Sequence, residues 1–193
     1  MKHFILCLKL FVFSYLGYLL FFLASAYEPS SPGFSPPFSL WVLDTINLYI
    51  HEAGHLFLRP FGQFIHVLGG SLVQVLIPLA LLIVTWRQNA GQIVYAGFWL
   101  GENMINVSVY IQDAPFRKLR LIAKGLIHDW WWLLNGDEAI SAPLSETVFL
   151  LGLAICALAL AAGVFYAVKA FGEERAPAAP SLAWSRQFPG RAV

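Results

Sequence analysis

Charged residues are scarce in this chain of 193 residues. Asp, Glu, Lys and Arg make up 12% of the sequence and hydrophobic residues 59%, whereas roughly 25% of an ordinary soluble domain is charged. This shortage excludes an ordinary soluble domain and predicts a polytopic protein whose main partner is membrane lipid. The formal net charge is only +1 and no basic patch stands out, which excludes nucleic acid as a partner.

Cysteine is almost absent as well. Cys7 and Cys156 are the two cysteines, and both fall in apolar runs far apart in the sequence. Two such residues support neither a disulfide framework nor a zinc site with cysteine ligands. We expect both thiols to be inert, either in the core or facing lipid.

The chain contains several long apolar stretches. At roughly 20 residues each, they match the length that a helix needs to cross a bilayer. We therefore expect an all-α polytopic membrane protein with about five transmembrane helices, in a single membrane domain over residues 1–171. The spans are expected at about 4–26, 38–58, 67–86, 92–111 and 147–171. The Ala-, Pro- and Arg-rich residues 172–193 are predicted to form a disordered tail.

Basic residues predict the orientation. Lys2 at the start of the first span favours a cytoplasmic N-terminus, and the loop at 114–145 contains Arg117, Lys118, Arg120 and Lys124. We therefore expect this loop on the cytoplasmic side of a bacterial inner membrane. Within it, Trp130–Leu134 predicts an aromatic interfacial helix. Ala24-Ser25-Ala26 is similar to a signal-peptidase site, so cleavage after residue 26 stays open, as does the side of the tail.

One motif carries chemistry: His51-Glu52-Ala53-Gly54-His55, inside the second predicted span. Histidines four residues apart share one helix face, so both imidazoles can reach a single zinc ion. Glu52 lies on the adjoining side, where it can act as a general base. The alternative is a histidine pair that forms hydrogen bonds within a helix bundle and binds no metal. Ionisable residues in an apolar span are costly unless they pair, bind a metal or line a cavity, which favours metal binding.

A catalytic zinc site needs further ligands. Such sites have three protein ligands and an open position. Asp113 closes the fourth predicted span on the same side of the membrane as the histidines. His128 is its rival, since Asp129 can serve as the N-cap of the aromatic helix and leave His128 free. Asp129 itself is a further candidate ligand, and His66 a weaker one.

Other polar residues in the spans are candidates for supporting roles. Asn47 lies one turn from His51 and can orient its ring, and Gln74 can hydrogen-bond to a zinc ligand. Asn106 or Gln74 can stabilise an oxyanion. Asp44 shares the face of the histidines but lies too far along the helix to touch the zinc.

A glycine pair opens the third apolar stretch. Gly69-Gly70-Ser71 permits a close approach of two helices, or it borders a substrate strand near the metal. Helix packing is the favoured interpretation.

A span with His-Glu-x-x-His, a glycine-bearing segment and a later span ending in aspartate resembles the site-2 protease family of intramembrane zinc metalloproteases. This resemblance implies that His51, His55 and Asp113 bind zinc and that Glu52 is the general base. The chain is more similar still to a group of small bacterial membrane proteins. The shared motifs are His-Glu-Ala-Gly-His, Pro-Phe-Gly, Gly-Gly-Ser, Asp-Ala and His-Asp-Trp, at residues 51–55, 60–62, 69–71, 113–114 and 128–130.

We therefore expect a membrane-embedded zinc metallopeptidase that hydrolyses peptide bonds of a membrane protein or peptide, in or near the bilayer. The zinc site is expected near the cytoplasmic face. The alternative is a non-catalytic membrane protein with a structural zinc, held by the four ligands His51, His55, Asp113 and His128. Metal transport or sensing is a weaker alternative, because no second group of ligands marks a path across the membrane.

Overall fold

The protein is all-helical. The computed structural model describes residues 2–119 and 127–173, and these contain no strand. The helices are α1 (Lys2–Ser25), α2 (Phe38–Leu58), η1 (Arg59–Phe61), α3 (Gln63–Gln88), η2 (Ala90–Gln92), α4 (Ile93–Asp113), α5 (Asp129–Leu134) and α6 (Glu138–Glu173). Most of the predicted tail, residues 174–193, and the loop cations Arg120 and Lys124 lie outside the described residues.

Each of the five segments predicted as a span is helical. The second has the bounds expected for it, because Pro37 precedes the first helical residue and Arg59-Pro60 follows the last. The last is longer than predicted: α6 begins at Glu138 and continues through Gly172 and Glu173, the first residues assigned to the tail.

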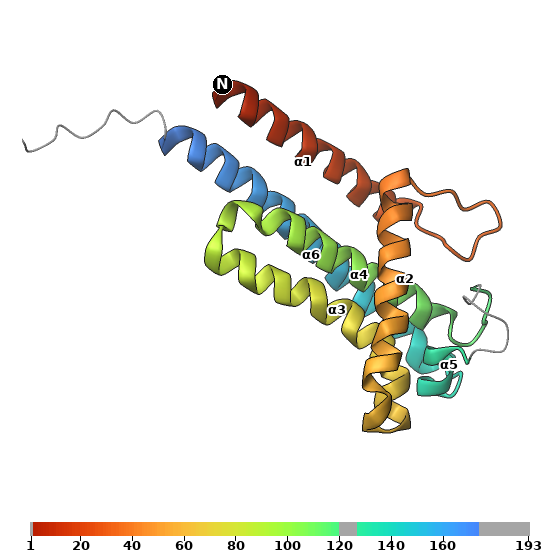
Figure 1. The fold of residues 1–193 in the computed structure, drawn as a ribbon. Helices are drawn as coiled ribbons and strands as arrows, with labels where there is room; N and C mark the ends of the chain where they lie inside the picture. Colours follow the sequence, from red (N-terminus) through yellow and green to blue (C-terminus); the bar gives the residue numbers. More distant parts are fainter. Residues whose placement is uncertain (1, 120–126, 174–193) are drawn as a thin grey trace, which may run out of the picture.

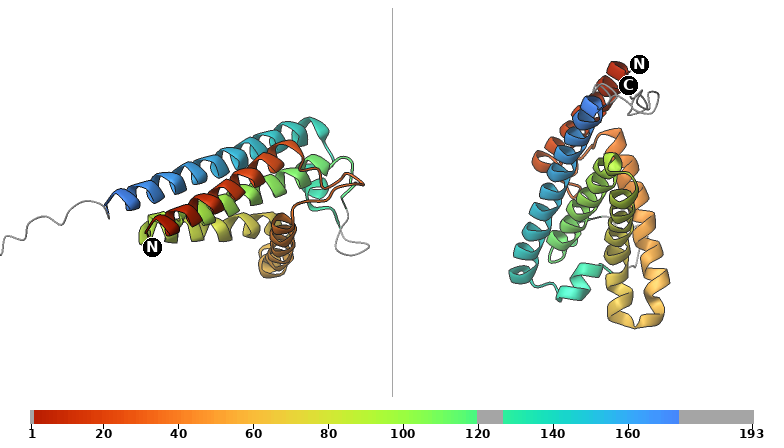
Figure 2. Two further views of the ribbon diagram at one scale, coloured as in Figure 1. Left: turned by 90° about the horizontal axis from the view of Figure 1, so that it is seen from above. Right: turned by 90° about the vertical axis from the view of Figure 1, so that its left-hand side faces the viewer.

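Within the described residues, three helices are long and apolar enough to cross a membrane. They lie at His3–Ser25, Gln63–Gln88 and Glu138–Glu173, in α1, α3 and α6. Helices α2 and α4 are 21 residues long each and carry acidic side chains within their length, among them Asp44 and Glu102. Figure 1 shows that the axes of α1, α3, α4 and α6 are roughly parallel, with α3 and α6 running opposite to α1 and α4, whereas α2 lies across them. Figure 2 shows the same crossing from above, where α2 is seen nearly end-on.

Helices α4 and α6 pack with their backbones in contact. A Cβ atom added to Gly101 would lie 2.5 Å from Cys156 Sγ, and one added to Gly152 would lie 2.7 Å from the Gly101 carbonyl oxygen. Small residues therefore allow this close approach. Cys156 is fully buried in this contact, whereas Cys7 is exposed, and both are free thiols.

A second close contact joins α2 to α3. A Cβ atom added to Gly69 would lie 2.9 Å from the Gly54 carbonyl oxygen, so the glycine pair serves helix packing, as favoured from the sequence. Reciprocal hydrogen bonds reinforce the contact: His55 Nδ1 donates to the backbone oxygen of His66 (2.8 Å), and His66 Nδ1 donates to that of His55 (2.9 Å). The end of α2 is thereby fixed against the start of α3.

Candidate metal centre

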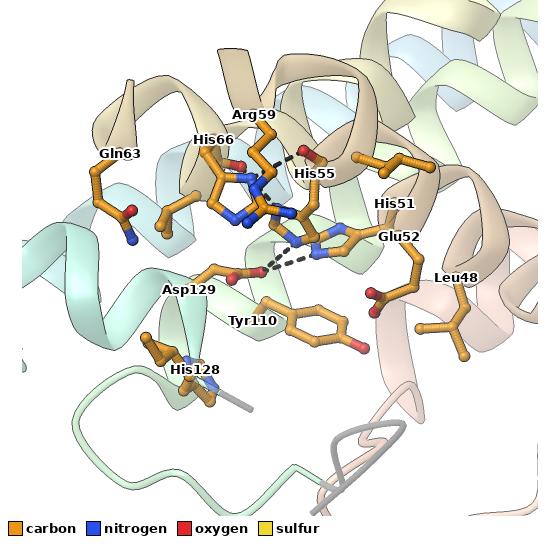
Figure 3. A pocket seen from close by; sticks show the side chains of 13 residues that line it. Leu48, His51, Glu52, His55, Arg59, Gln63, His66, Tyr110, His128 and Asp129 are labelled. Atoms are coloured by element: carbon orange, nitrogen blue, oxygen red, sulfur yellow. Dashed lines mark hydrogen bonds and ion pairs between the residues drawn. The ribbon is translucent and has the colours of Figure 1, made fainter. Parts of the chain in front are cut away.

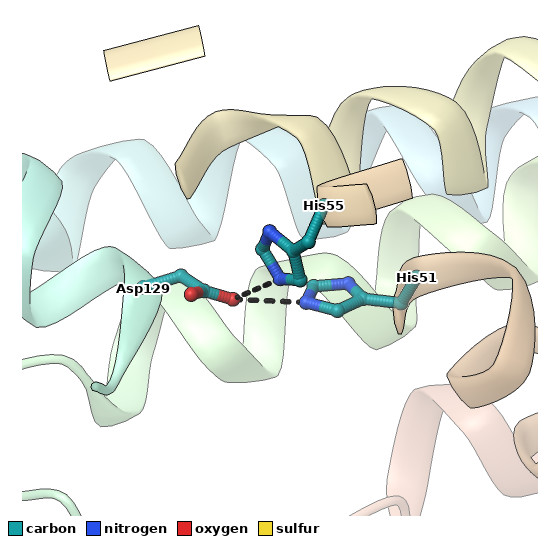
Figure 4. A group of neighbouring side chains, drawn as sticks. All are labelled: His51, His55 and Asp129. Atoms are coloured by element: carbon teal, nitrogen blue, oxygen red, sulfur yellow. Dashed lines mark hydrogen bonds and ion pairs between the residues drawn. The ribbon is translucent and has the colours of Figure 1, made fainter. Parts of the chain in front are cut away.

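The two histidines of the motif converge on one carboxylate. His51 and His55 lie one turn apart on α2, with ring centroids 4.8 Å apart. His51 Nε2 lies 2.9 Å and His55 Nε2 3.1 Å from Oδ2 of Asp129, in the first turn of α5 (Figure 4). The three ligand atoms all lie within 4.8 Å of one another, so this group could hold a metal ion.

In each ring, the hydrogen-bond partner of Nδ1 shows which nitrogen carries the hydrogen and which carries the lone pair. His55 Nδ1 faces the backbone oxygen of His66 at 2.8 Å, and this oxygen can only accept. His51 Nδ1 lies 3.0 Å from Gln74 Oε1, which also accepts. Both Nδ1 atoms therefore carry the hydrogen, and the neutral rings direct their Nε2 lone pairs toward Asp129. Three electron-pair donors that face one another require a cation between them, either a metal ion or added protons.

Asp129 is suited to be an anionic ligand. Burial by itself would raise the pKa of this carboxyl, but when His51 and His55 are protonated, their hydrogen bonds and positive charge outweigh burial and lower the pKa to about 2. The group is therefore a carboxylate at neutral pH. Its position depends on α5, which packs against α3 and α4; Trp130 Nε1 donates to Ser71 Oγ of α3 at 3.0 Å.

The N-cap of α5 differs from the prediction. His128, not Asp129, is the N-cap residue, and its Nδ1 accepts a hydrogen bond from the backbone N–H of Trp131 at 3.3 Å. The reason is geometric, since Asp129 in the first turn points away from the helix toward α2 (Figure 3). Because Nδ1 accepts, Nε2 of His128 carries the hydrogen and donates to Asp113 Oδ2 at 3.2 Å.

Asp113 and His128, both predicted as metal ligands, are joined to each other rather than to the group on α2. Asp113 also accepts from the backbone N–H groups of Lys118 and Leu119, each at 2.9 Å. Both side chains are buried, with relative exposures of 5% and 4%. Their hydrogen bonds join the end of α4 to the start of α5, so the pair braces the helix that carries Asp129.

Gly70 packs directly against both imidazoles. A Cβ atom added to this residue of α3 would lie 2.4 Å from His51 Nε2 and 2.6 Å from His55 Nε2. These distances are shorter than ordinary Cβ contacts, so a side chain at position 70 would push the two rings out of their positions. Glycine therefore allows the rings to take the positions in which they face Asp129, and the donor set of two imidazoles and a carboxylate fits a metal ion.

The group borders a cavity of about 700 Å³ (Figure 3). Glu52 and Arg59 line this cavity together with the three candidate ligands. Tyr110 of α4 also lines it, and its ring stacks on His51 with centroids 5.8 Å apart and an interplanar angle of 24°. The cavity is thus lined by the candidate metal ligands, by the carboxylate of Glu52 and by the hydroxyl group of Tyr110.

The predicted supporting residues fall into two sets. Gln74 contacts His51, and its Nε2 donates to Asn106 Oδ1 at 2.8 Å. Asn47 makes its hydrogen bonds elsewhere: its Nδ2 donates to Glu102 Oε2 at 2.8 Å and its Oδ1 accepts from Trp99 Nε1 at 2.9 Å. Asn47 therefore supports the packing of α2 on α4 rather than the ring of His51.

Sequence reasoning missed Tyr110 as part of the site, and for Gly70 it favoured helix packing over a place near the metal. Tyr110 lies four residues after Asn106, and that spacing on a polar helix face was a usable signal. Gly70 gave no such signal, because its role depends on the crossing of α2 and α3.

Comparison with known proteins does not name a relative for this chain. No protein-family model matches it, and no curated protein or solved structure matches it significantly. The functional conclusion therefore rests on the geometry of the site.

Proposed function

We propose that this protein is a membrane zinc metallopeptidase that hydrolyses peptide bonds in or near the bilayer. One observation carries the proposal: the Nε2 lone pairs of His51 and His55 meet the Asp129 carboxylate beside a cavity that Glu52 also lines. The proposed roles agree with those implied by the resemblance to site-2 proteases, except that Asp129 replaces Asp113 as the third ligand.

Imidazole and carboxylate ligands suit zinc. His51, His55 and Asp129 would hold a Zn²⁺ ion, which would supply Lewis acidity and make water a nucleophile at neutral pH. Glu52 accepts the proton of the attacking water and delivers it to the leaving amine. Tyr110 can donate its hydroxyl hydrogen to the developing oxyanion. It replaces Asn106 and Gln74 in this role, because their amide groups are engaged with each other and with His51.

The membrane setting is part of the proposal. Helices α1, α3 and α6 are apolar enough to span a bilayer, and we propose that α2 and α4 complete about five spans, with α5 as an interfacial helix. Arg117 and Lys118 follow α4 at the end that carries the metal group, which supports a cytoplasmic position for the site in a bacterial inner membrane. The substrate is then a membrane protein or a peptide close to lipid.

Two other functions receive less support. A structural zinc needs four protein ligands, and the candidates for the fourth, Asp113 and His128, satisfy each other. Metal transport needs further binding groups along a path, whereas within residues 2–119 and 127–173 a single such group of three or more side chains occurs.

The test compares wild type with Glu52→Gln, both purified in lipid nanodiscs. We expect both proteins to hold one zinc ion, and we expect the variant to lose about 10²- to 10⁴-fold in the cleavage rate of a panel of membrane proteins. Glu146→Gln, on the exposed surface of α6, is the matched control and should retain activity. Equal cleavage by wild type and Glu52→Gln, or no cleavage by zinc-loaded wild type, would refute the assignment.

A further inference from the structure

His51 is joined to a distant carboxylate by a chain of hydrogen bonds through three helices. His51 Nδ1 donates to Gln74 Oε1 (3.0 Å), and Gln74 Nε2 donates to Asn106 Oδ1 (2.8 Å). Asn106 Nδ2 in turn lies 3.1 Å from Asp44 Oδ1 and 2.9 Å from the Tyr27 hydroxyl oxygen. The chain thus starts on α2, crosses α3 and α4, and returns to α2 two turns before His51.

The carboxylate end gives this chain its direction. Asp44 Oδ1 accepts the hydroxyl hydrogen of Tyr27 at 2.7 Å, so it also acts as an acceptor toward Asn106. Asn106 must therefore turn its NH₂ group to Asp44 and its oxygen to Gln74. Gln74 must then turn its own NH₂ group to Asn106 and its oxygen to His51. Reversing the two amides would place two oxygen atoms 3.1 Å apart at Asp44.

The direction of the chain decides what His51 offers to a metal. With an oxygen at Nδ1, the hydrogen of the neutral ring resides on Nδ1 and the Nε2 lone pair is free. With an NH₂ group there, the hydrogen would move to Nε2 and block the ligand position. Gln74 is only 2% exposed, so water cannot readily replace its partners and correct a reversed amide.

We propose that Asp44 and Asn106 are positioning residues, which act through Gln74 to hold His51 in the tautomer that binds metal. Asp44 never touches the ion; it acts from the opposite end of the chain. The inference rests on the proposed metal centre but not on peptidase activity.

A double-mutant cycle tests this role. Asn106→Leu removes the group that orients Gln74, so the affinity for Zn²⁺ should fall by about 10- to 100-fold, as for other residues that support metal ligands. Gln74→Glu places an acceptor at His51 whichever way it is turned. In the Gln74→Glu background, Asn106→Leu should therefore leave the affinity unchanged. Asp44→Asn, a smaller change in shape, should show the same dependence on background with a smaller loss.

The measurements are Zn²⁺ affinity by chelator competition and the visible spectrum of the Co²⁺-loaded protein, with thermal unfolding of the metal-free proteins as the control for folding. An equal loss in both backgrounds would mean that Asn106 supports the fold only, and this would overturn the proposal. So would unchanged affinity in Asn106→Leu, or a wild type that binds no metal. If the expected pattern appears in a protein that cleaves no peptide, the positioning role stands and the peptidase assignment fails.

Discussion

Two arrangements of histidine and aspartate lie on either side of Tyr110. They differ in which nitrogen of the imidazole ring carries the hydrogen and in which group accepts it. At His51, His55 and Asp129, both Nδ1 hydrogens are donated away from the carboxylate, so the remaining lone pairs meet in one place. At His128, Nδ1 accepts a backbone N–H, and the ring hydrogen is donated to Asp113. The first arrangement directs three electron-pair donors at one another and so suits a cation, whereas in the second every donor faces an acceptor.

This comparison shows that a buried histidine beside an aspartate is not by itself a metal ligand. Burial is similar in both places, since His51 and His128 have relative exposures of 6% and 5%. The partner of the other ring nitrogen makes the difference: an acceptor there leaves a free lone pair, and a donor there removes it. The predictions below test this contrast.

The largest effect is expected from the histidines themselves. His51→Ala should weaken zinc binding on the order of a thousandfold, since one of three ligands contributes about a third of the roughly 10–16 kcal/mol typical of protein zinc sites. His128→Asn keeps an N-cap side chain and should weaken binding by no more than about tenfold. Chelator competition measures both affinities. Similar losses of zinc affinity in the two variants would contradict the proposed difference between the two arrangements.

Gly70→Ala should have the next largest effect. The new methyl group would lie 2.4 Å from His51 Nε2 and 2.6 Å from His55 Nε2 and would displace both rings. We expect a loss of affinity of about 100-fold, at the upper end of the range for residues that support metal ligands. Gly17→Ala in α1, where a Cβ atom meets nothing within 4 Å, is the matched control and should bind zinc normally. Full zinc occupancy of Gly70→Ala at micromolar metal would show that binding does not depend on the positions of these two rings.

Substitution of the two aspartates should have different effects. At Asp129 it should lower the affinity for zinc, and at Asp113 it should lower the stability of the metal-free protein. Asp129→Asn should lower zinc affinity by more than about tenfold. At a pH at which both imidazoles are neutral, it should change the unfolding temperature of the metal-free protein little, because the neutral rings donate no hydrogen bond to position 129. Asp113→Asn leaves a backbone N–H or the His128 ring without its charged acceptor, and should cost about 1–3 kcal/mol of metal-free stability. Thermal unfolding and metal titration of both variants measure this. The opposite pattern would make Asp113 the ligand and Asp129 the brace.

The smallest effect is expected at the docking contact of α5. Trp130→Phe removes the hydrogen bond to Ser71 but keeps most of the aromatic surface. The loss should be about 1 kcal/mol of metal-free stability, with zinc affinity reduced by less than about tenfold. Hydrogen exchange of the α5 amides, which should become faster, provides the measurement. Unchanged exchange would mean that His128 and Asp113 alone hold α5 in place.

The sequence predicted the features that depend on local periodicity. The helices and the pairing of His51 with His55 follow from residue spacing. The bounds of the second helix follow from Pro37 before it and Pro60 after it. The third candidate ligand, Asp129, could not be singled out in this way. Asp129 reaches the site because α5 folds back onto α3 across a connection from α4, and spacing within a helix says nothing about such a contact.

The crossing of α2 was equally inaccessible to sequence reasoning. Hydropathy predicts whether a segment can enter a membrane, but the direction of a helix depends on its neighbours. Here Gly54 and Gly69 let two backbones meet, and this contact sets the direction of α2. The role of Gly70 follows from the same contact, so neither feature was visible before the helices were placed.

The separation of His55 from Asp129 along the chain is 74 residues. An ion bound to both is therefore a cross-link that closes a loop containing α3 and α4. In the chain-entropy description, a disulfide that closes a loop of this size stabilises a protein by about 4 kcal/mol. Neither cysteine of this protein forms such a bond. A bound metal would then act as a reversible cross-link in the fold, and chelation would loosen α5 before it disturbed the contact of α4 with α6.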